Sequence, residues 1–119
     1  MCGKCGTPLL DGSPVELSDA TFDRVVSKTE IPLVVDFWAA WCGPCRMMEP
    51  HFVQAAKRLK GRVLLARVNS DENPQTSSRH AIRSLPTLLM LRNGAELKRQ
   101  AGSIGTAQIV AWSEAGLAA

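Results

Sequence analysis

Apolar residues fall along this chain in short runs that alternate with stripes at helical spacing. The clearest run, Leu33 to Ala39 (LVVDFWA), has the length of one strand and is apolar on both sides, which is typical of a strand covered on both faces. Asn93-Gly94 predicts a tight hairpin that leads into a strand over residues 95–101. Three further runs predict strands, over residues 15–17, 62–68 and 87–91.

Helices are predicted between these strands. Ser18 and Asp19 offer N-cap chemistry to a first helix that ends before Pro32, and Thr106 offers it to a last helix. Two more helices are predicted, from Gly43-Pro44 to about Lys60 and from Asn73-Pro74 to His80. The resulting order, β-α-β-α-β-α-β-β-α, predicts an α/β fold with a mixed central sheet flanked by helices on both faces.

Size and composition fit one compact domain. The chain has 119 residues, 45% of them hydrophobic, and we expect residues 15–119 to form the domain behind an N-terminal tail of residues 1–14. Its 14 basic and 11 acidic residues are scattered, which argues against a nucleic-acid or membrane surface. Neither a membrane-spanning run nor the apolar stretch of a signal peptide is seen, so we expect a cytoplasmic protein.

The four cysteines form two CxxC pairs in different surroundings. Cys42 and Cys45 lie where a buried strand ends and a helix begins, a position that favours a thiolate, the nucleophile of thiol-disulfide exchange. Cys42 is nearer the helix start and should attack, and Cys45 is close enough to resolve the mixed disulfide. A zinc half-site or an inert buried pair would also fit an isolated CxxC, but a cytoplasmic CxxC beside a βαβ pattern favours redox chemistry.

The segments D-F-W-A-A-W-C-G-P-C-R, I-R-S-L-P-T-L and N-G resemble the thioredoxin family, and the resemblance runs from about Leu17 to the C-terminus. It implies the thioredoxin fold and the reduction of protein disulfides. It also implies that Cys42 is the nucleophile, Cys45 the resolving thiol and Asp36 a buried carboxylate that assists proton transfer at Cys45.

Asp36 is the one charge inside an apolar strand. Burial should raise the pKa of its carboxyl group, as a proton carrier near neutral pH requires. The alternative is an Asp that is simply satisfied by a buried partner. Position 67 usually carries Lys in the family, near this Asp, and carries Arg here, so whether Arg67 reaches Asp36 is open.

The family geometry also implies a shallow apolar groove for substrates. Pro86 matches the family's cis-proline, although on sequence alone an ordinary turn proline fits equally well. The groove would be formed by Trp41, Gly43, Pro44, Leu85, Pro86, Gly102 and Ser103.

The resemblance further implies the partners. Electrons would come from NADPH through a flavin-containing thioredoxin reductase and pass to disulfide-containing proteins, with no cofactor on this chain beyond the Cys42–Cys45 pair. We expect a monomer.

The second pair, Cys2 and Cys5, resembles a zinc knuckle of the thioredoxin-2 subfamily, whose N-terminal extension carries two such pairs. Only one pair is present here, whereas a structural zinc site takes four ligands, so Cys2 and Cys5 are a half-site. Zinc could bind there if the other two ligands lay on residues absent from this chain or on a second molecule. Three rival functions follow from the two pairs and the fold: a disulfide oxidase or isomerase, a zinc-linked redox sensor, and a thioredoxin-fold binding subunit.

Overall fold

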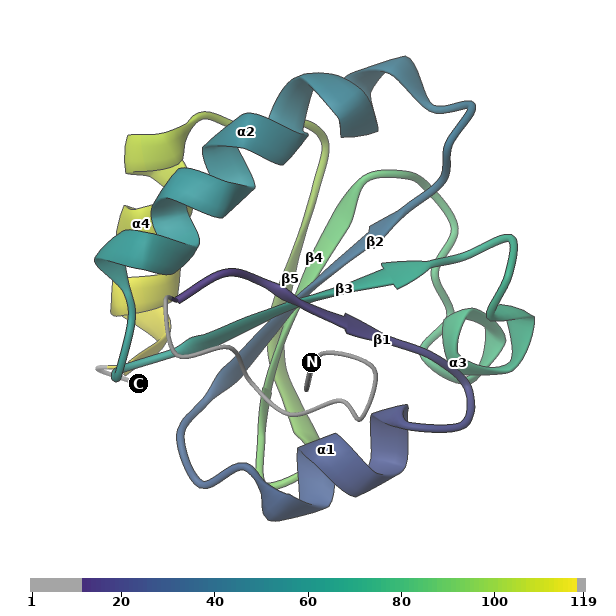
Figure 1. The fold of residues 1–119 in the computed structure, drawn as a ribbon, viewed down its shortest axis with the longest axis horizontal. Coiled ribbons are helices and arrows are strands. Elements are labelled where there is room, and N and C mark those ends of the chain that lie inside the picture. Colours follow the sequence, from purple (N-terminus) through teal and green to yellow (C-terminus); the bar gives the residue numbers. More distant parts are fainter. Residues whose placement is uncertain (1–11, 118–119) are drawn as a thin grey trace.

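The computed structural model describes residues 12–117, which form one mixed sheet with helices on both of its faces (Figure 1). The strands are β1 (Val15–Leu17), β2 (Leu33–Trp38), β3 (Leu64–Asn69), β4 (Thr87–Arg92) and β5 (Ala95–Ala101). The helices are α1 (Phe22–Lys28), α2 (Gly43–Arg58), α3 (Pro74–Arg79) and α4 (Thr106–Leu117). None of the helices within residues 12–117 is long and apolar enough to cross a membrane.

The strand order in the sheet is β1-β3-β2-β4-β5. The neighbours β1, β3 and β2 run parallel, whereas β4 pairs antiparallel with both β2 and β5. The hairpin between β4 and β5 turns at Asn93 and Gly94, whose φ values of 52° and 82° are those that a two-residue hairpin needs. The predicted α/β fold and order of elements are confirmed.

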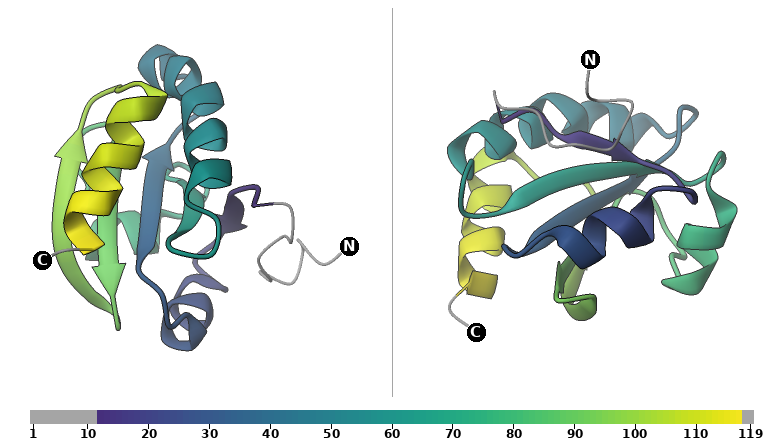
Figure 2. Two further views of the ribbon diagram at one scale, coloured as in Figure 1. Left: turned by 90° about the vertical axis from the view of Figure 1, so that its left-hand side faces the viewer. Right: turned by 60° about the horizontal axis from the view of Figure 1, so that its bottom comes forward.

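Two layers of helices bury the two faces of β2, which explains why its sequence is apolar on both sides. Leu33, Val35 and Phe37 pack in one core with Phe22 of α1. Val34 packs in the other core, which contains buried side chains of α2 and α4. As Figure 2 shows, α2 and α4 lie together on one side of the sheet and α1 lies on the other. Asp36 alternates with Val35 and Phe37 and therefore faces the α2 side.

Asp19 caps α3 and not α1, so that part of the sequence prediction is wrong. Its carboxylate accepts hydrogen bonds from the N–H groups of Gln75 and Thr76 at 3.3 and 2.8 Å, and from the Thr76 hydroxyl at 2.7 Å. Helix α1 begins after Thr21, whose side chain makes no cap bond. Because β1 and β3 are neighbours, the loop after β1 lies beside the start of α3, and tertiary contact decides which helix is capped.

Asn73 and Thr106 also differ from their predicted capping roles. The Asn73 side chain accepts from the Asp19 N–H at 2.8 Å and donates to the Asn69 carbonyl at 3.0 Å, so it ties two loops together. Thr106 is already helical, and its N–H donates to His51 Nδ1 at 3.3 Å. A side chain on α2 therefore satisfies a free N–H at the start of α4.

Candidate active site

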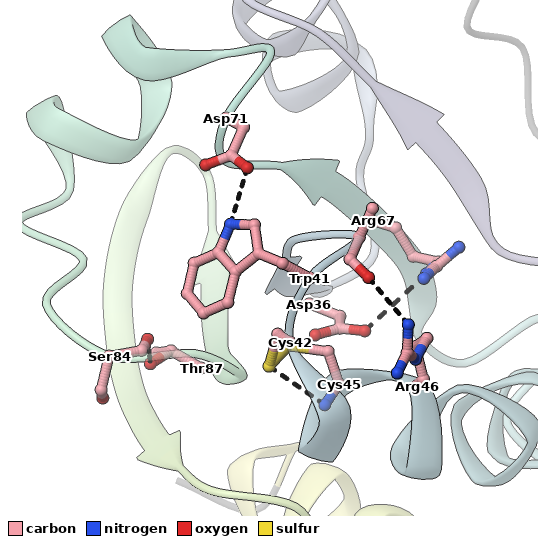
Figure 3. The surroundings of a disulfide bond; sticks show 10 residues. Asp36, Trp41, Cys42, Cys45, Arg46, Arg67, Asp71, Ser84 and Thr87 are labelled. Atoms are coloured by element: carbon pink, nitrogen blue, oxygen red, sulfur yellow. Dashed lines mark hydrogen bonds and ion pairs between the residues drawn. A yellow bond between two sulfur atoms is a disulfide. The ribbon is translucent and has the colours of Figure 1, made fainter.

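Cys42 and Cys45 lie at the N-terminus of α2, just beyond the end of β2, and are joined by a disulfide whose Cα atoms are 5.3 Å apart (Figure 3). Cys42 is the N-cap residue of the helix, and its Sγ accepts a hydrogen bond from the Cys45 N–H at 3.2 Å. Both residues are buried. Pro44 occupies the first turn of the helix, where a backbone N–H has no acceptor within the helix, so the lack of this group in proline costs no hydrogen bond. The N-cap position directs N–H groups and the positive end of the helix dipole at Cys42 Sγ.

Asp36 lies in the middle layer of the protein with no exposed surface. Neither of its carboxylate oxygens has a hydrogen-bond partner within residues 12–117. Burial, above all, raises the pKa of Asp36 to about 7; Glu16 and Glu49 add to the rise and the nearby Arg67 charge opposes it. With a pKa of about 7, the side chain can change protonation near neutral pH.

Arg67 does reach the surroundings of Asp36, although it makes no hydrogen bond to it. Its Nε lies 3.8 Å from Asp36 Oδ2, and its guanidinium carbon lies 4.3 Å from the centre of the Trp38 ring. Figure 3 shows the Asp36 carboxyl group between the disulfide and the Arg67 side chain. The Asp36 carboxyl group is therefore buried close to the disulfide, and the positive charge of Arg67 beside it is not in hydrogen-bond contact.

The peptide bond between Leu85 and Pro86 is cis, as the family resemblance implies. The Pro86 carbonyl accepts a hydrogen bond from the Gly102 N–H at 2.9 Å, which brings these two expected groove residues together. Gly102 has a φ of 95°, a conformation that favours glycine. Trp41 and Leu85 share an open pocket of about 240 Å³.

Trp41 is the most prominent apolar side chain beside the disulfide. It is 68% exposed, and its indole N–H donates to Asp71 Oδ2 at 2.7 Å (Figure 3). Asp71 lies in the loop after β3, so a contact distant in sequence fixes the tryptophan at the rim of the pocket.

Comparison with known proteins identifies the family to which the chain belongs. The family model described as Thioredoxin matches residues 13–115. The chain belongs to the thioredoxin family. Thioredoxin C-3 of Corynebacterium nephridii is 38% identical over 111 residues, covering 93% of this chain and 76% of that protein. The thioredoxin of Rhodospirillum rubrum is 40% identical over 100 residues, covering 84% of this chain and 96% of that protein.

A crystal structure of chloroplastic thioredoxin z superimposes with a TM-score of 0.80 at 30% identity, covering 90% of this chain and 96% of that one. This thioredoxin is accordingly a thiol-disulfide oxidoreductase with protein-disulfide reductase activity, and Cys42–Cys45 is its redox-active disulfide.

The pocket of this thioredoxin includes residues that the sequence analysis did not single out. Arg83 and Ile82 belong to the I-R-S-L-P-T-L segment and so carried a signal, whereas Ser70 and Ser77 belong to no motif. Pro86 itself is buried. The pocket is lined by Trp41, Ser70, Ser77, Ile82, Arg83, Ser84 and Leu85.

The zinc half-site expected at Cys2 and Cys5 lies outside the described residues. Within residues 12–117, no group of three or more His, Cys, Asp or Glu side chains is placed to hold a metal ion.

Proposed function

We propose that this thioredoxin reduces disulfides of other proteins in the cytoplasm in two exchange steps, with Cys42 as nucleophile, Cys45 as resolving thiol and Asp36 as proton acceptor. The observation that carries the proposal is the N-cap position of Cys42, whose Sγ already accepts a backbone hydrogen bond. When the disulfide is reduced, the same N–H group and helix dipole stabilise the Cys42 thiolate, which is the reactive form of a thiol.

In the first step, the Cys42 thiolate attacks one sulfur of the substrate disulfide. A new bond joins Cys42 Sγ to that sulfur, the substrate's own S–S bond breaks, and its other sulfur leaves as a thiolate. The substrate is then held to the protein by a mixed disulfide.

In the second step, Cys45 gives its proton to Asp36 and its thiolate attacks Cys42 Sγ. The Cys42–Cys45 bond forms, the mixed disulfide breaks, and the substrate leaves with its second thiolate. Two electrons have passed from the cysteine pair to the substrate. Asp36 suits this role because a pKa of about 7 lets it both take and return a proton at cellular pH.

The substrate segment would lie in the groove beside the disulfide, with backbone contacts near the Leu85–Pro86 bond. Such contacts depend little on side-chain identity, so the groove would accept many proteins weakly. Its proposed members are Trp41, Gly43, Pro44, Leu85, Pro86, Gly102 and Ser103.

The family implies reductase and substrate partners in general. The electron donor that we propose is a flavin-containing thioredoxin reductase that draws on NADPH. The proposed working unit is a monomer in which residues 15–119 are the thioredoxin domain and residues 1–14 a tail.

Asp36→Asn tests the proton-transfer step. We expect release of the mixed disulfide to slow by up to about 100-fold, the lower end of what a positioned general base supplies, with no loss of fold. The measurement is the single-turnover rate of release from pH 6 to pH 8, with Asp23→Asn, an exposed carboxylate, as the matched control. Equal rates for Asp36→Asn and the unchanged protein across this pH range would exclude Asp36 as the proton acceptor.

Cys2 and Cys5 are proposed to be a remnant half-site, related to the thioredoxin-2 extension but lacking two of its four ligands. We expect native mass spectrometry of the full chain to show loss of two hydrogens at Cys42–Cys45 on oxidation, without bound zinc. A zinc ion that is released as Cys2 and Cys5 oxidise would instead support a zinc-linked redox sensor.

A further inference from the structure

Three charged residues lie side by side across the sheet near the disulfide. Glu16 of β1 pairs with Arg67 of β3, and Arg67 pairs with Asp36 of β2. Side chains at paired positions of neighbouring strands emerge on the same face, and here this is the face that α2 covers. A fourth charge, Glu49, comes from α2 itself, and its carboxylate lies 3.6 Å from Arg67 Nη1.

The Arg67 guanidinium bonds to Glu16 and only comes within ion-pair distance of Asp36. Its Nη1 donates to Glu16 Oε2 at 2.9 Å, whereas its Nε lies 3.8 Å from Asp36 Oδ2, beyond hydrogen-bond distance. The guanidinium also lies over the Trp38 ring, and the Arg67 side chain is only 12% exposed. Arg67 is therefore held in place by two surface carboxylates and an aromatic ring.

This orientation decides how strongly Arg67 acts on Asp36. An opposite charge at close contact typically lowers a carboxyl pKa by about 1–3 units, and a hydrogen bond lowers it further. At 3.8 Å the contact is too long for a full hydrogen bond, and burial outweighs the lowering effect of Arg67, so the pKa of Asp36 remains raised. The charged groups that act on it are Arg67 from β3, Glu16 from β1 and Glu49 from α2, whereas its β4 partner, Leu88, is apolar.

We propose that Glu16 and Glu49 are positioning residues that hold the Arg67 guanidinium at ion-pair distance from Asp36 but out of hydrogen bonding to it, so that Asp36 stays free to accept the Cys45 proton. The inference rests on the proton-acceptor role proposed above for Asp36. The negative charges of Glu16 and Glu49 also act directly on Asp36 and raise its pKa, so the positioning effect is the part of their influence that requires Arg67.

The test is a carbon-13 NMR titration of the Asp36 carboxyl group in the full-length, oxidised protein, where the cysteines do not titrate. In Glu16→Gln/Glu49→Gln we expect the Asp36 midpoint to fall by about one pH unit or more, because Arg67 becomes free to bond Asp36. The inflection in the pH profile of mixed-disulfide release should move to lower pH by the same amount.

Two controls separate positioning from the mere loss of negative charge. Glu72→Gln removes a carboxylate close enough to act on Glu16, but one with no ion pair to Arg67 within residues 12–117, and should shift the midpoint much less. In an Arg67→Met background, whose fold is checked by thermal unfolding, the double Glu→Gln change should lower the midpoint only by the direct effect of the two lost charges, and so by clearly less than when Arg67 is present. A shift of equal size with and without Arg67 would overturn the proposal in favour of simple charge.

An unmoved Asp36 midpoint in Glu16→Gln/Glu49→Gln would overturn the proposal while leaving the role of Asp36 intact. If the midpoint moves as expected but Asp36→Asn releases substrate normally, the positioning of Arg67 stands and the proposed proton transfer fails. The two hypotheses are thus tested separately.

Discussion

Replacing Cys42 with Ser is expected to abolish reduction of protein disulfides, down to the uncatalysed rate. The reason is that exchange needs a thiolate at the N-cap of α2, and a serine hydroxyl does not ionise there at cellular pH. The measurement is NADPH oxidation in the presence of thioredoxin reductase and a disulfide-containing protein.

Cys45→Ser is the matched control, because it removes a sulfur from the same turn but leaves the attacking one. This variant should complete the first step and then accumulate a mixed disulfide that mass spectrometry detects. Turnover by Cys42→Ser would mean that Cys45 can attack, which its place inside the helix argues against. A Cys42→Ser protein that still performed its cellular role would instead indicate a binding subunit.

Asp36 is expected to make the stability of the oxidised protein fall as pH rises from about 4 to about 7. Its pKa is raised from 3.8 to about 7 on folding, so between these values the folded chain holds a proton that the unfolded chain has lost. Stability is therefore highest below the unfolded value and is lost as pH rises through the folded value. Three pKa units correspond to about 4 kcal/mol in the free energy of unfolding.

Denaturant unfolding of the oxidised protein at pH 4 to 8 measures this slope, with Asp36→Asn as the comparison. The variant has no proton to lose at this position and should show a much flatter profile. A small slope should remain, since burial also raises the pKa of Glu16 despite the opposing Arg67 charge. Parallel profiles for the two proteins would show that the Asp36 pKa is not raised.

The fold was predictable because hydrophobic pattern determines which segments are covered. LVVDFWA reads as a strand buried on both faces, and β2 is central and covered on both. Helix caps were less predictable. The local sequence suits Asp19 and Thr106 to cap the helices that follow them, but each instead bonds to a residue more than 50 positions away. Local propensity gives way there to tertiary contact.

In the candidate site, too, local sequence predicts some features and tertiary contacts determine others. Cys42 and Cys45 could be found from their immediate sequence, because their position depends on a strand end and a helix start, and the burial of Asp36 could be predicted from the apolar strand around it. The direction of the Arg67 guanidinium could not, because it depends on Glu16 and Glu49, which only strand register and α2 bring close. Asp71 had no sequence signal as the partner of Trp41.

The bond between Trp41 and Asp71 has a consequence for binding kinetics. An exposed side chain usually loses rotational freedom when a partner docks, at a cost of about 0.5–1.5 kcal/mol. The Trp41 ring is exposed yet already tethered, so most of that entropy is lost when the chain folds and not when a substrate arrives. The ring can then supply apolar contact to successive partners without reorganising, which lowers the entropic cost of each docking event.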